Sequence, residues 1–318
     1  MKKDIWLIGS GGMAVDYVKV LQALELNFSI IGRGEQSAKN CREATGCEVI
    51  TGSLLGYLST KPPVSSHAIV AVGVEKLHET TLQLLDYGVK NILVEKPAGL
   101  NKQEIEMVYQ KAKERNAQVF VAYNRRFYAS VLRAKEILSE DGGMTSFNFE
   151  FTEWAHEIEK LRKADGVKEN WFLGNSSHVV DLAFYLGGKP KEICTFTAGG
   201  LAWHPAASIF SGAGVSESGA LFSYQANWES AGRWSVEMLT KNHRLILRPM
   251  EKLQIQKKGS VAVEFAVCDY KLDESFKPGL FLQTKHFINN TKDGLCDIEY
   301  HIGMMDKYNR IASYEVMM

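Results

Sequence analysis

A short glycine-rich stretch near the start of the chain has the residue types needed to hold a phosphate. Gly9-Ser10-Gly11-Gly12-Met13-Ala14 follows the pattern G-x-G-x-x-A, between an apolar run at 5–8 and a helical pattern at 13–26. Small residues let the chain turn tightly, let the backbone approach a pyrophosphate and let the helix pack on the sheet, and the helix N-terminus then binds the phosphate. A glycine turn without ligand is the alternative. We predict a dinucleotide site formed by Gly9, Ser10, Gly11, Gly12 and Met13.

The residues after the second apolar run, 28–31, bear on which dinucleotide binds. An acidic residue there would hydrogen-bond the ribose 2′-hydroxyl of NAD. The sequence has Arg33 between two glycines instead, and a guanidinium suits a 2′-phosphate, with Ser37 and Lys39 able to assist. Two alternatives stay open, because Arg33 could stack on the adenine and Glu35 could serve the ribose. We expect NADP(H) as the preferred cofactor, with NAD(H) as the alternative.

A lysine follows the apolar run at 92–94, in the tripeptide Glu95-Lys96-Pro97. Ligands of a parallel sheet bind beyond the carboxyl ends of its strands, so we expect Glu95, Lys96 and Pro97 to line the cofactor cleft. A lysine there can hydrogen-bond a substrate hydroxyl or carbonyl oxygen, and desolvation can lower its pKa. Taken alone, the tripeptide fits a surface lysine before a helix-starting proline better.

A histidine and an aspartate are spaced to share one face of a helix, as His178 and Asp181. Ser176 or Ser177 can cap that helix, which would place His178 in its first turn. A histidine can accept a carbinol proton near neutral pH, and Asp181 could orient it or bind a sugar hydroxyl. A histidine that only packs is equally compatible with these residues. Because no convincing third ligand accompanies the pair, we expect no metal site.

The elements that would position these residues change in kind near residue 122. Up to there, short apolar strands alternate with helices, which predicts a parallel sheet covered on both faces. Asn101 is expected to cap one of these helices together with Glu104. Beyond residue 122, strand follows strand, which predicts one large, mostly antiparallel sheet. The expected strands there are 145–152, 192–197, 220–228, 234–240, 244–247 and 261–267.

Helices are expected at 130–139, around 177–187 and 278–292, and near 300–315. The stretch 199–219 is rich in Gly, Ala and Ser, and we expect it to form a long, mobile connection.

Composition limits the class of protein. The 318 residues carry 37 basic and 37 acidic side chains, so the formal net charge is zero, which argues against binding to nucleic acid or to an anionic membrane. No apolar run approaches the roughly 18 residues of a membrane span. Five cysteines without a C-x-x-C pair are typical of a cytoplasmic protein. The length predicts two domains, which we place at 1–122 for dinucleotide binding and 123–318 for substrate binding and oligomerisation, with the last helix able to pack back on the first domain.

Taken together, these motifs resemble the glucose–fructose oxidoreductase, inositol 2-dehydrogenase and rhizopine-catabolism (Gfo/Idh/MocA) family. The residues that carry the resemblance are Gly9–Ala14, His78, Val94–Ala98, Ala122–Phe127 and Ser177–Leu182. The resemblance implies an α/β protein, with an N-terminal Rossmann domain and a C-terminal α/β domain whose large, mostly antiparallel open sheet often forms an oligomer interface, here of a homodimer or homotetramer. It also implies hydride transfer between a nicotinamide and a hydroxyl or keto carbon of a sugar, cyclitol or nucleotide-sugar.

By the same resemblance, Lys96 is the catalytic lysine, the peptide bond before Pro97 is often cis, and His178 shares in proton transfer. Arg126 fits a domain-interface ion pair as well as a substrate contact. The residues expected to contact substrate are Asn124, Arg125, Asn175 and Asp181.

The sequence departs from the family at Gly174, where many members carry an Asp that assists catalysis or binds substrate. This departure leaves open a protein that senses a dinucleotide without turnover. A second alternative keeps the nicotinamide as a transient redox agent for elimination or glycoside cleavage. The motif Asn175-Ser176-Ser177-His178 is similar to a branch associated with surface-polysaccharide sugars, which suggests a nucleotide-activated or amino sugar as substrate.

Overall fold

The computed structural model describes residues 4–314, which form two compact units. Residues 4–124 and 272–303 make up the first unit, and residues 125–271 and 304–314 make up the second. The first unit thus includes a segment, 272–303, that the sequence placed in the second domain. This segment joins the first unit because its strand and its helix pack on the N-terminal sheet.

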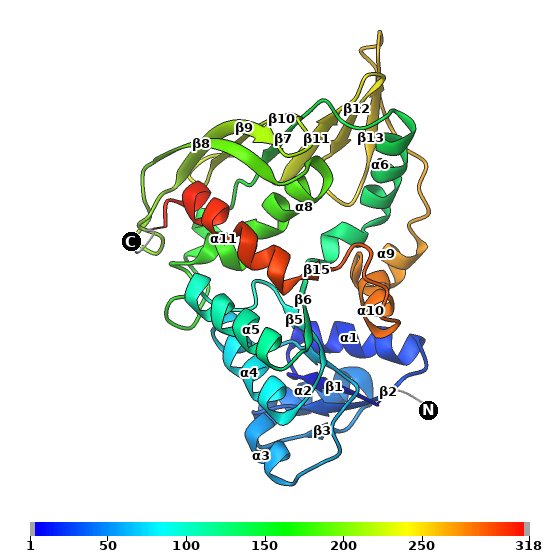
Figure 1. Ribbon diagram of the computed structural model, residues 1–318, viewed down its shortest axis with the longest axis vertical. Helices are drawn as coiled ribbons and strands as arrows, with labels where there is room; N and C mark the ends of the chain where they lie inside the picture. Colours follow the sequence, from blue (N-terminus) through cyan, green and yellow to red (C-terminus); the bar gives the residue numbers. More distant parts are fainter. Residues whose placement is uncertain (1–3, 315–318) are drawn as a thin grey trace. The chain divides into compact units, whose positions relative to one another are not determined.

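Seven strands form the sheet of the first unit, in the order β15-β6-β5-β4-β1-β2-β3 (Figure 1). They are β1 (Asp4–Ile8), β2 (Asn27–Ile31), β3 (Val49–Ile50), β4 (His67–Val70), β5 (Asn91–Glu95), β6 (Gln118–Ala122) and β15 (Cys296–Asp297). Six of these strands pair in parallel, as predicted, and β15 adds to β6 as an antiparallel edge. The central strands read as apolar runs because both of their faces are covered: Ile5, Leu7 and Ile69 are fully buried.

The helices of the first unit lie on both faces of this sheet. They are α1 (Gly12–Ala23), α2 (Glu35–Thr45), α3 (Leu54–Ser59), α4 (Leu77–Tyr87), α5 (Lys102–Glu114) and α10 (Leu280–Ile288). The strand order runs one way from β1 to β3 and the other way from β4 to β6, so right-handed crossovers put α1 and α2 on one face and α4 and α5 on the other. Helix α10 packs beside α1. The strand order reverses between β1 and β4, and sheets of this kind bind ligands beyond the carboxyl ends of the strands at such a reversal.

Asn101 caps α5 as predicted. Its Oδ1 accepts from the Glu104 N–H at 3.0 Å. The Glu104 carboxylate in turn accepts from the Leu100 N–H at 2.7 Å and lies 2.8 Å from His78 Nδ1. The cap therefore fixes the start of α5 and ties it to the first turn of α4.

Eight strands form the sheet of the second unit, in the order β14-β13-β12-β11-β7-β10-β9-β8. They are β7 (Ser146–Glu150), β8 (Pro190–Ala198), β9 (Ile209–Ser216), β10 (Leu221–Asn227), β11 (Ser235–Leu239), β12 (His243–Leu247), β13 (Gln254–Lys257) and β14 (Val263–Phe265). Only β7 and β10 pair in parallel, so the prediction of a large, mostly antiparallel sheet is confirmed.

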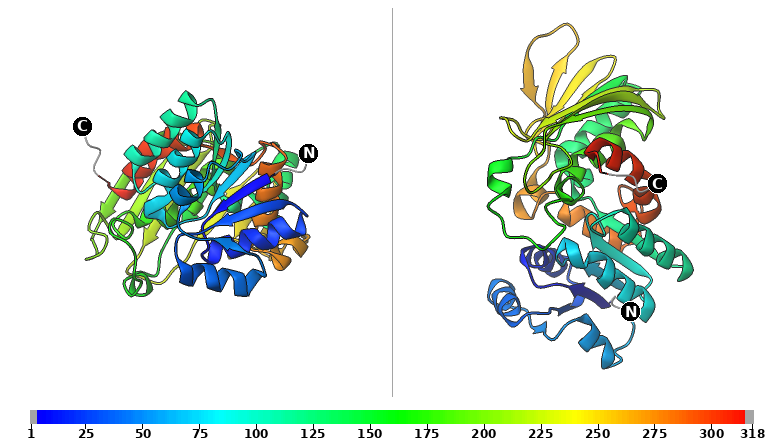
Figure 2. Two further views of the ribbon diagram at one scale, coloured as in Figure 1. Left: turned by 90° about the horizontal axis from the view of Figure 1, so that it is seen from below. Right: turned by 90° about the vertical axis from the view of Figure 1, so that its left-hand side faces the viewer.

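The helices of the second unit lie on one face of its sheet (Figures 1 and 2). They are α6 (Ala129–Glu140), α7 (Ala155–Ile158), α8 (Ser177–Gly187) and most of α11 (Ile298–Ala312). The short helix α9 (Lys271–Ser275) begins at the last residue of segment 125–271 and otherwise belongs to segment 272–303 of the first unit. Phe184 of α8 packs against the rings of Phe147, Phe149 and Phe222 from the sheet. Apolar side chains elsewhere on the sheet are exposed, including Phe196 at 71% and Leu221 at 63%.

Strand β9 corrects one expectation. The stretch 199–219 was expected to be a mobile connection, but Ile209–Ser216 form a strand that pairs with both β8 and β10. A Cβ on Gly212 would lie 2.4 Å from the Tyr224 ring and 2.5 Å from the Cys194 carbonyl oxygen, and one on Gly214 would lie 2.1 Å from the Glu192 carbonyl oxygen and 2.6 Å from the Phe222 ring. The glycines therefore make room for aromatic rings of β10 and for the backbone of β8, and they do not loosen the chain.

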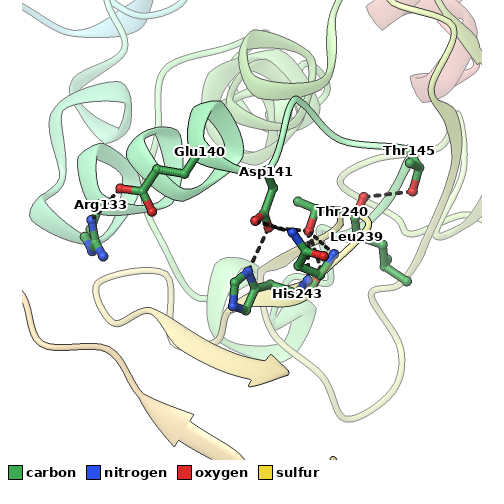
Figure 3. Close-up of polar contacts among 8 residues, drawn as sticks. Arg133, Glu140, Asp141, Thr145, Leu239, Thr240 and His243 are labelled. Atoms are coloured by element: carbon green, nitrogen blue, oxygen red, sulfur yellow. Dashed lines mark hydrogen bonds and ion pairs between the residues drawn. The ribbon is translucent and has the colours of Figure 1, made fainter. Parts of the chain in front are cut away.

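The hairpin that joins β11 to β12 is fixed by a single carboxylate, Asp141, at the end of α6 (Figure 3). Asp141 accepts from the Thr240 hydroxyl and from Asn242 Nδ2 at 3.0 Å, and its Oδ2 lies 2.7 Å from His243 Nδ1. These hydrogen bonds lower the pKa of Asp141 to about 2, the bond from Thr240 contributing most.

All five cysteines are free thiols. Among the described helices, none combines the length and the apolar character that crossing a bilayer would require.

Candidate functional site

The turn between β1 and α1 places the glycine-rich stretch at the carboxyl edge of the first sheet. Gly9 has a φ of 119°, and a Cβ on it would lie 2.2 Å from the Ala71 carbonyl oxygen, so only glycine fits. Its N–H donates to the Ile31 carbonyl. A Cβ on Gly11 or Gly12 would meet nothing within 4 Å, so the backbone at the start of α1 faces open space. The residues present therefore fit a dinucleotide, whose phosphates would approach the helix N–H groups.

A cleft of about 590 Å³ opens at this turn and brings together most of the predicted cofactor residues. Its lining includes Gly9, Ser10, Gly11, Gly12, Met13, Arg33 and Ser37. The hydroxyls of Ser10 and Ser37 are hydrogen-bonded at 2.9 Å, and Arg33 is exposed on the wall that follows β2. Of the residues that the structure describes, Glu35 and Lys39 do not line this cleft.

A second basic side chain, Lys76, lines the same cleft from the segment after β4. It lies 2.8 Å from Glu79, and this hydrogen bond, more than the added charge of Arg33, lowers the pKa of Glu79. Sequence reasoning did not single out Lys76. The cleft lining thus carries two cations, Arg33 and Lys76, and two carboxylates, Glu75 and Glu79, of which Glu79 is paired to Lys76.

Lys96 directly follows the carboxyl end of β5, and the Lys96–Pro97 peptide bond is cis, as the resemblance implied. The carbonyl oxygen of Pro97 lies 3.0 Å from His301 Nε2. At Glu95, the residue before Lys96, the buried carboxylate accepts a hydrogen bond from the Tyr17 hydroxyl at 2.8 Å. Burial raises the pKa of Glu95, while the Tyr17 bond and the charges of Lys96 and Lys277 oppose that shift. Within the described part of the chain, these predicted residues lie outside the 590 Å³ cleft.

Asn124, a predicted substrate contact, has a buried side chain with a role inside the first unit. Its Nδ2 donates to the Pro278 carbonyl oxygen at 2.9 Å. With its amide oxygen and nitrogen exchanged, Gln283 accepts from the Tyr123 and Asn124 N–H groups. These bonds attach the segment before α10 to the end of β6, and a role toward substrate stays a prediction.

His178 lies on a helix that begins earlier than predicted. Phe172–Ser176 form a π-helical turn that runs directly into α8, and Ser176 makes no capping hydrogen bond. The predicted cap is therefore wrong, because the backbone is already helical at both serines and Ser177 Oγ donates back to the Leu173 carbonyl. His178 is buried, and its ring centre lies 6.4 Å from that of Trp234. Turns of this kind are frequent at functional sites.

Asp181 is held by Arg126. Arg126 Nε donates to Oδ2 at 2.8 Å and Nη2 donates to Oδ1 at 2.6 Å, and the side chains are 4% and 1% exposed. Burial raises the pKa of Asp181, and the Arg126 charge and hydrogen bonds oppose the shift. The Arg126 guanidinium also stacks on Tyr185, with Cζ 4.5 Å from the ring centre. The structure thus assigns both Asp181 oxygens to Arg126, in an ion pair that lies within the second unit.

A buried carboxylate that sequence reasoning missed, Glu153, organises the π-helical turn. Its Oε1 accepts from Asn175 Nδ2 at 2.9 Å and from Ser176 Oγ at 2.8 Å, and its Oε2 lies 3.3 Å from Arg233. At Gly174, a Cβ would meet nothing within 4 Å. The carboxylate at this turn therefore comes from the segment after β7 and not from position 174. Its sequence signal was an acidic residue just past the end of a predicted strand.

Arg125 packs on the indole of Trp234, the same ring that neighbours His178. Its Cζ is 4.5 Å from the Trp234 ring centre, and burial lowers its pKa. The second unit thus gathers Arg125, Asn175 and His178 around one cluster, to which Glu153, Arg233 and Trp234 also belong. Among residues 4–314, no group of three or more His, Cys, Asp or Glu side chains could hold a metal ion.

The parallel sheet, its reversed strand order and its glycine turn define the first unit as a Rossmann domain. Residues 3–123 match the model of a family described as an oxidoreductase family with an NAD-binding Rossmann fold, GFO_IDH_MocA. Over this domain the chain matches the Gfo/Idh/MocA oxidoreductase family, which confirms the resemblance for residues 3–123.

In sequence, the chain is similar to scyllo-inositol 2-dehydrogenase (NADP(+)) IolW of Bacillus subtilis (strain 168), with 24% identity over 137 residues. That match spans 42% of this chain and only 38% of the relative.

Solved structures resemble the whole chain. UDP-N-acetylglucosamine 3-dehydrogenase GnnA from Acidithiobacillus ferrooxidans is 14% identical, with a TM-score of 0.75 over 98% of this chain and 97% of its own. Levoglucosan dehydrogenase in complex with NADH is 16% identical, with a TM-score of 0.78 over 98% and 96%. At these identities the likeness shows the fold, Rossmann domain and open-sheet domain together.

Proposed function

We propose that the protein is an NAD(P)-dependent oxidoreductase that transfers hydride to or from a hydroxyl or keto carbon of a sugar, cyclitol or nucleotide-sugar. The observation that carries the proposal is the β1–α1 turn, where Gly9 admits no side chain and the start of α1 faces open space. The family match supports the redox class. Relatives named for inositol, levoglucosan and a nucleotide-sugar support the substrate class.

NADP(H) is the preferred cofactor in this proposal, with NAD(H) as the alternative. Arg33 stands where an acidic residue would select the 2′-hydroxyl, and it lines the cleft together with Ser37 and Lys76. A doubly charged 2′-phosphate gains charge-assisted hydrogen bonds from such a wall, whereas a hydroxyl does not.

The proposed chemistry divides between a lysine and a histidine. Bound nicotinamide supplies a hydride acceptor for oxidation and a hydride donor for reduction. Lys96 hydrogen-bonds the reacting oxygen, and His178 takes the hydroxyl proton in oxidation and returns it in reduction. Arg125 and Asn175 contact the substrate, while Asp181 positions α8 through Arg126. Glu153 positions Asn175.

We also propose that the protein forms a homodimer or homotetramer in the cytoplasm, through the open face of the second sheet. Exposed Phe196 and Leu221 support this, since association would cover apolar surface that otherwise meets water. Sedimentation of the purified protein tests it, and a monomer at micromolar concentration contradicts it.

The deciding experiment follows nicotinamide absorbance with NADP or NAD and a panel of free and nucleotide-linked sugars. With the best sugar, Lys96→Met should lower turnover at least about 100-fold because the reacting oxygen loses its donor. NADPH affinity should stay near that of the unmodified protein. Lys113→Met, on the exposed side of α5, is the matched control. Near-normal turnover by Lys96→Met would refute the proposed role of this lysine.

A further inference from the structure

Two arginines of the second unit gather on one indole beside His178. Arg125 follows β6, while Arg233 and Trp234 precede β11. The Cζ atoms of Arg125 and Arg233 lie 4.5 Å and 4.6 Å from the centre of the Trp234 ring. The His178 ring centre is 6.4 Å from the same ring. The positive charges of Arg125 and Arg233 thus lie on the same indole, although they repel each other, and that indole neighbours His178, the proposed proton acceptor.

Arg233 is fixed by partners on several sides. Its guanidinium lies 3.3 Å from Glu153 and 4.8 Å from the centre of the Trp154 ring, in addition to Trp234. The Trp154 indole N–H donates to the Gly232 carbonyl oxygen, and this bond fixes the loop residue that directly precedes Arg233. Glu153 is already shared with Asn175 and Ser176, so its one negative charge serves Arg233 and two neutral donors.

Arg125 has less compensation. It packs on the rings of Trp234 and Tyr128, and its buried Nε has no acceptor within residues 4–314. The buried indole N–H of Trp234 has none there either. Burial lowers the pKa of Arg125, which means that its charge is poorly solvated, and Glu153 and Glu251 act on it only through space.

Buried donors in proteins are nearly always paired, so two unpaired donors on neighbouring side chains call for an acceptor. A guanidinium offers parallel N–H groups that match two oxygens of one group, and a carboxylate or a phosphate also balances the excess positive charge. A neutral hydroxyl could accept one bond but would leave the charge uncompensated.

We propose that Arg125 and Arg233, gathered on Trp234 beside His178, bind an oxyanion carried by the substrate, either a carboxylate or a phosphate. The inference rests on the proposed function, because that oxyanion is a substituent of the sugar whose proton His178 moves. It narrows the substrate to acidic sugars, such as uronates, and to phosphorylated sugars, nucleotide-linked ones included.

Calorimetric titration of the full-length protein with D-glucose, D-glucuronate and D-glucose 6-phosphate tests the inference. At least one anionic sugar should bind about 30-fold more tightly than glucose, and added salt should weaken only the anionic probes. The stronger of the two anionic probes identifies carboxylate or phosphate as the source. Arg125→Gln and Arg233→Gln should each remove most of this difference. Arg133→Gln, an exposed arginine of α6, should leave it unchanged.

Equal binding of the three sugars, or no measurable binding by either anionic probe, would overturn the inference. The inference would also be overturned if both arginine variants lost the same factor of affinity for glucose as for the anionic sugars. If Arg125→Gln does not fold, Arg233→Gln decides, since its side chain is 48% exposed. Failure of the proposed function reads differently: no sugar would change nicotinamide absorbance, while the preference for anionic sugars persisted.

Discussion

Replacing Arg126 by Met tests whether the helix that carries His178 depends on one buried ion pair. The Arg126 and Asp181 side chains are 4% and 1% exposed and share two hydrogen bonds of 2.6 Å and 2.8 Å. Removing one partner of such a pair leaves the other charge buried, at a cost of about 3–5 kcal/mol in the free energy of unfolding. We expect that loss for Arg126→Met at neutral pH.

The loss of unfolding free energy in Arg126→Met should depend on pH, and the direction of this dependence follows from the pKa of Asp181. Burial already raises the pKa of this carboxyl, and without Arg126 nothing opposes the shift. A carboxyl whose pKa is higher in the folded than in the unfolded state loses stability as pH rises from its unfolded pKa toward its folded pKa. Arg126→Met should therefore be less destabilised near pH 5 than near pH 8, because the buried carboxyl can then take up a proton.

Urea unfolding followed by tryptophan fluorescence measures this. Of the six tryptophans only Trp6 lies in the first unit, so the signal reports mainly the second unit. Arg133→Met is the matched control: Arg133 is 37% exposed and lies 2.7 Å from Glu136, and losing an exposed pair costs less than about 1 kcal/mol. Pairing Arg126→Met with Asp181→Leu should restore part of the stability. The reasoning fails if Arg126→Met costs no more than Arg133→Met, or if its cost is the same at both pH values.

Three further variants test other parts of the structure. Gly9→Ala should lower NADPH affinity by about 100-fold or more, since its Cβ would lie 2.2 Å from the Ala71 carbonyl oxygen. Gly142→Ala, which shares the positive φ but meets no atom within 4 Å, should not, and equal effects on affinity would contradict the steric argument. Arg33→Ala should weaken NADPH by about tenfold or more and NADH far less, as measured by fluorescence titration, and equal weakening would remove the case for NADP(H). Asp141→Ala should remove a stability term of about 2 kcal/mol that the protein has above pH ~4 and loses as pH falls toward 2, because its pKa is lowered to about 2 in the fold. Parallel acid-unfolding curves for the variant and the unmodified protein would contradict this.

The sequence predicted the first unit well because its signals are local. A strand, a glycine turn and a helix follow one another within a few residues, and Asn101 caps its own helix. Residues 272–303 were the exception. Their place in the first unit depends on β15 pairing with β6 and on α10 packing beside α1, and no local pattern encodes such distant contacts.

In the second unit, sequence reasoning found the residues of the helix but missed what surrounds them. His178 was identified, whereas Glu153, which bonds Asn175 and Ser176, comes from another element and was missed. Arg233, which packs on Trp234, was also missed, and Trp234 itself looked like core packing. The predicted serine cap failed for the same reason: the helix continues backwards through a π-helical turn that Glu153 holds from outside. Side chains that meet only in the folded state leave little trace in spacing along the chain.

The glycines of β9 also determine how β9 and β10 align. On the buried face, every cross-strand pair joins one aromatic ring to one small residue: Phe222 faces Gly214, Tyr224 faces Gly212, and Ala226 faces Phe210. A shift of two residues in one direction would bring Tyr224 against Phe210, and in the other it would leave Ala226 opposite Gly212 with a hole between them. Size alternation thus encodes the alignment that period-two hydrophobicity alone leaves degenerate, because such a shift keeps every apolar side chain on the same face. The glycine-rich strand β9 therefore favours a single register with β10 through the sizes of its side chains.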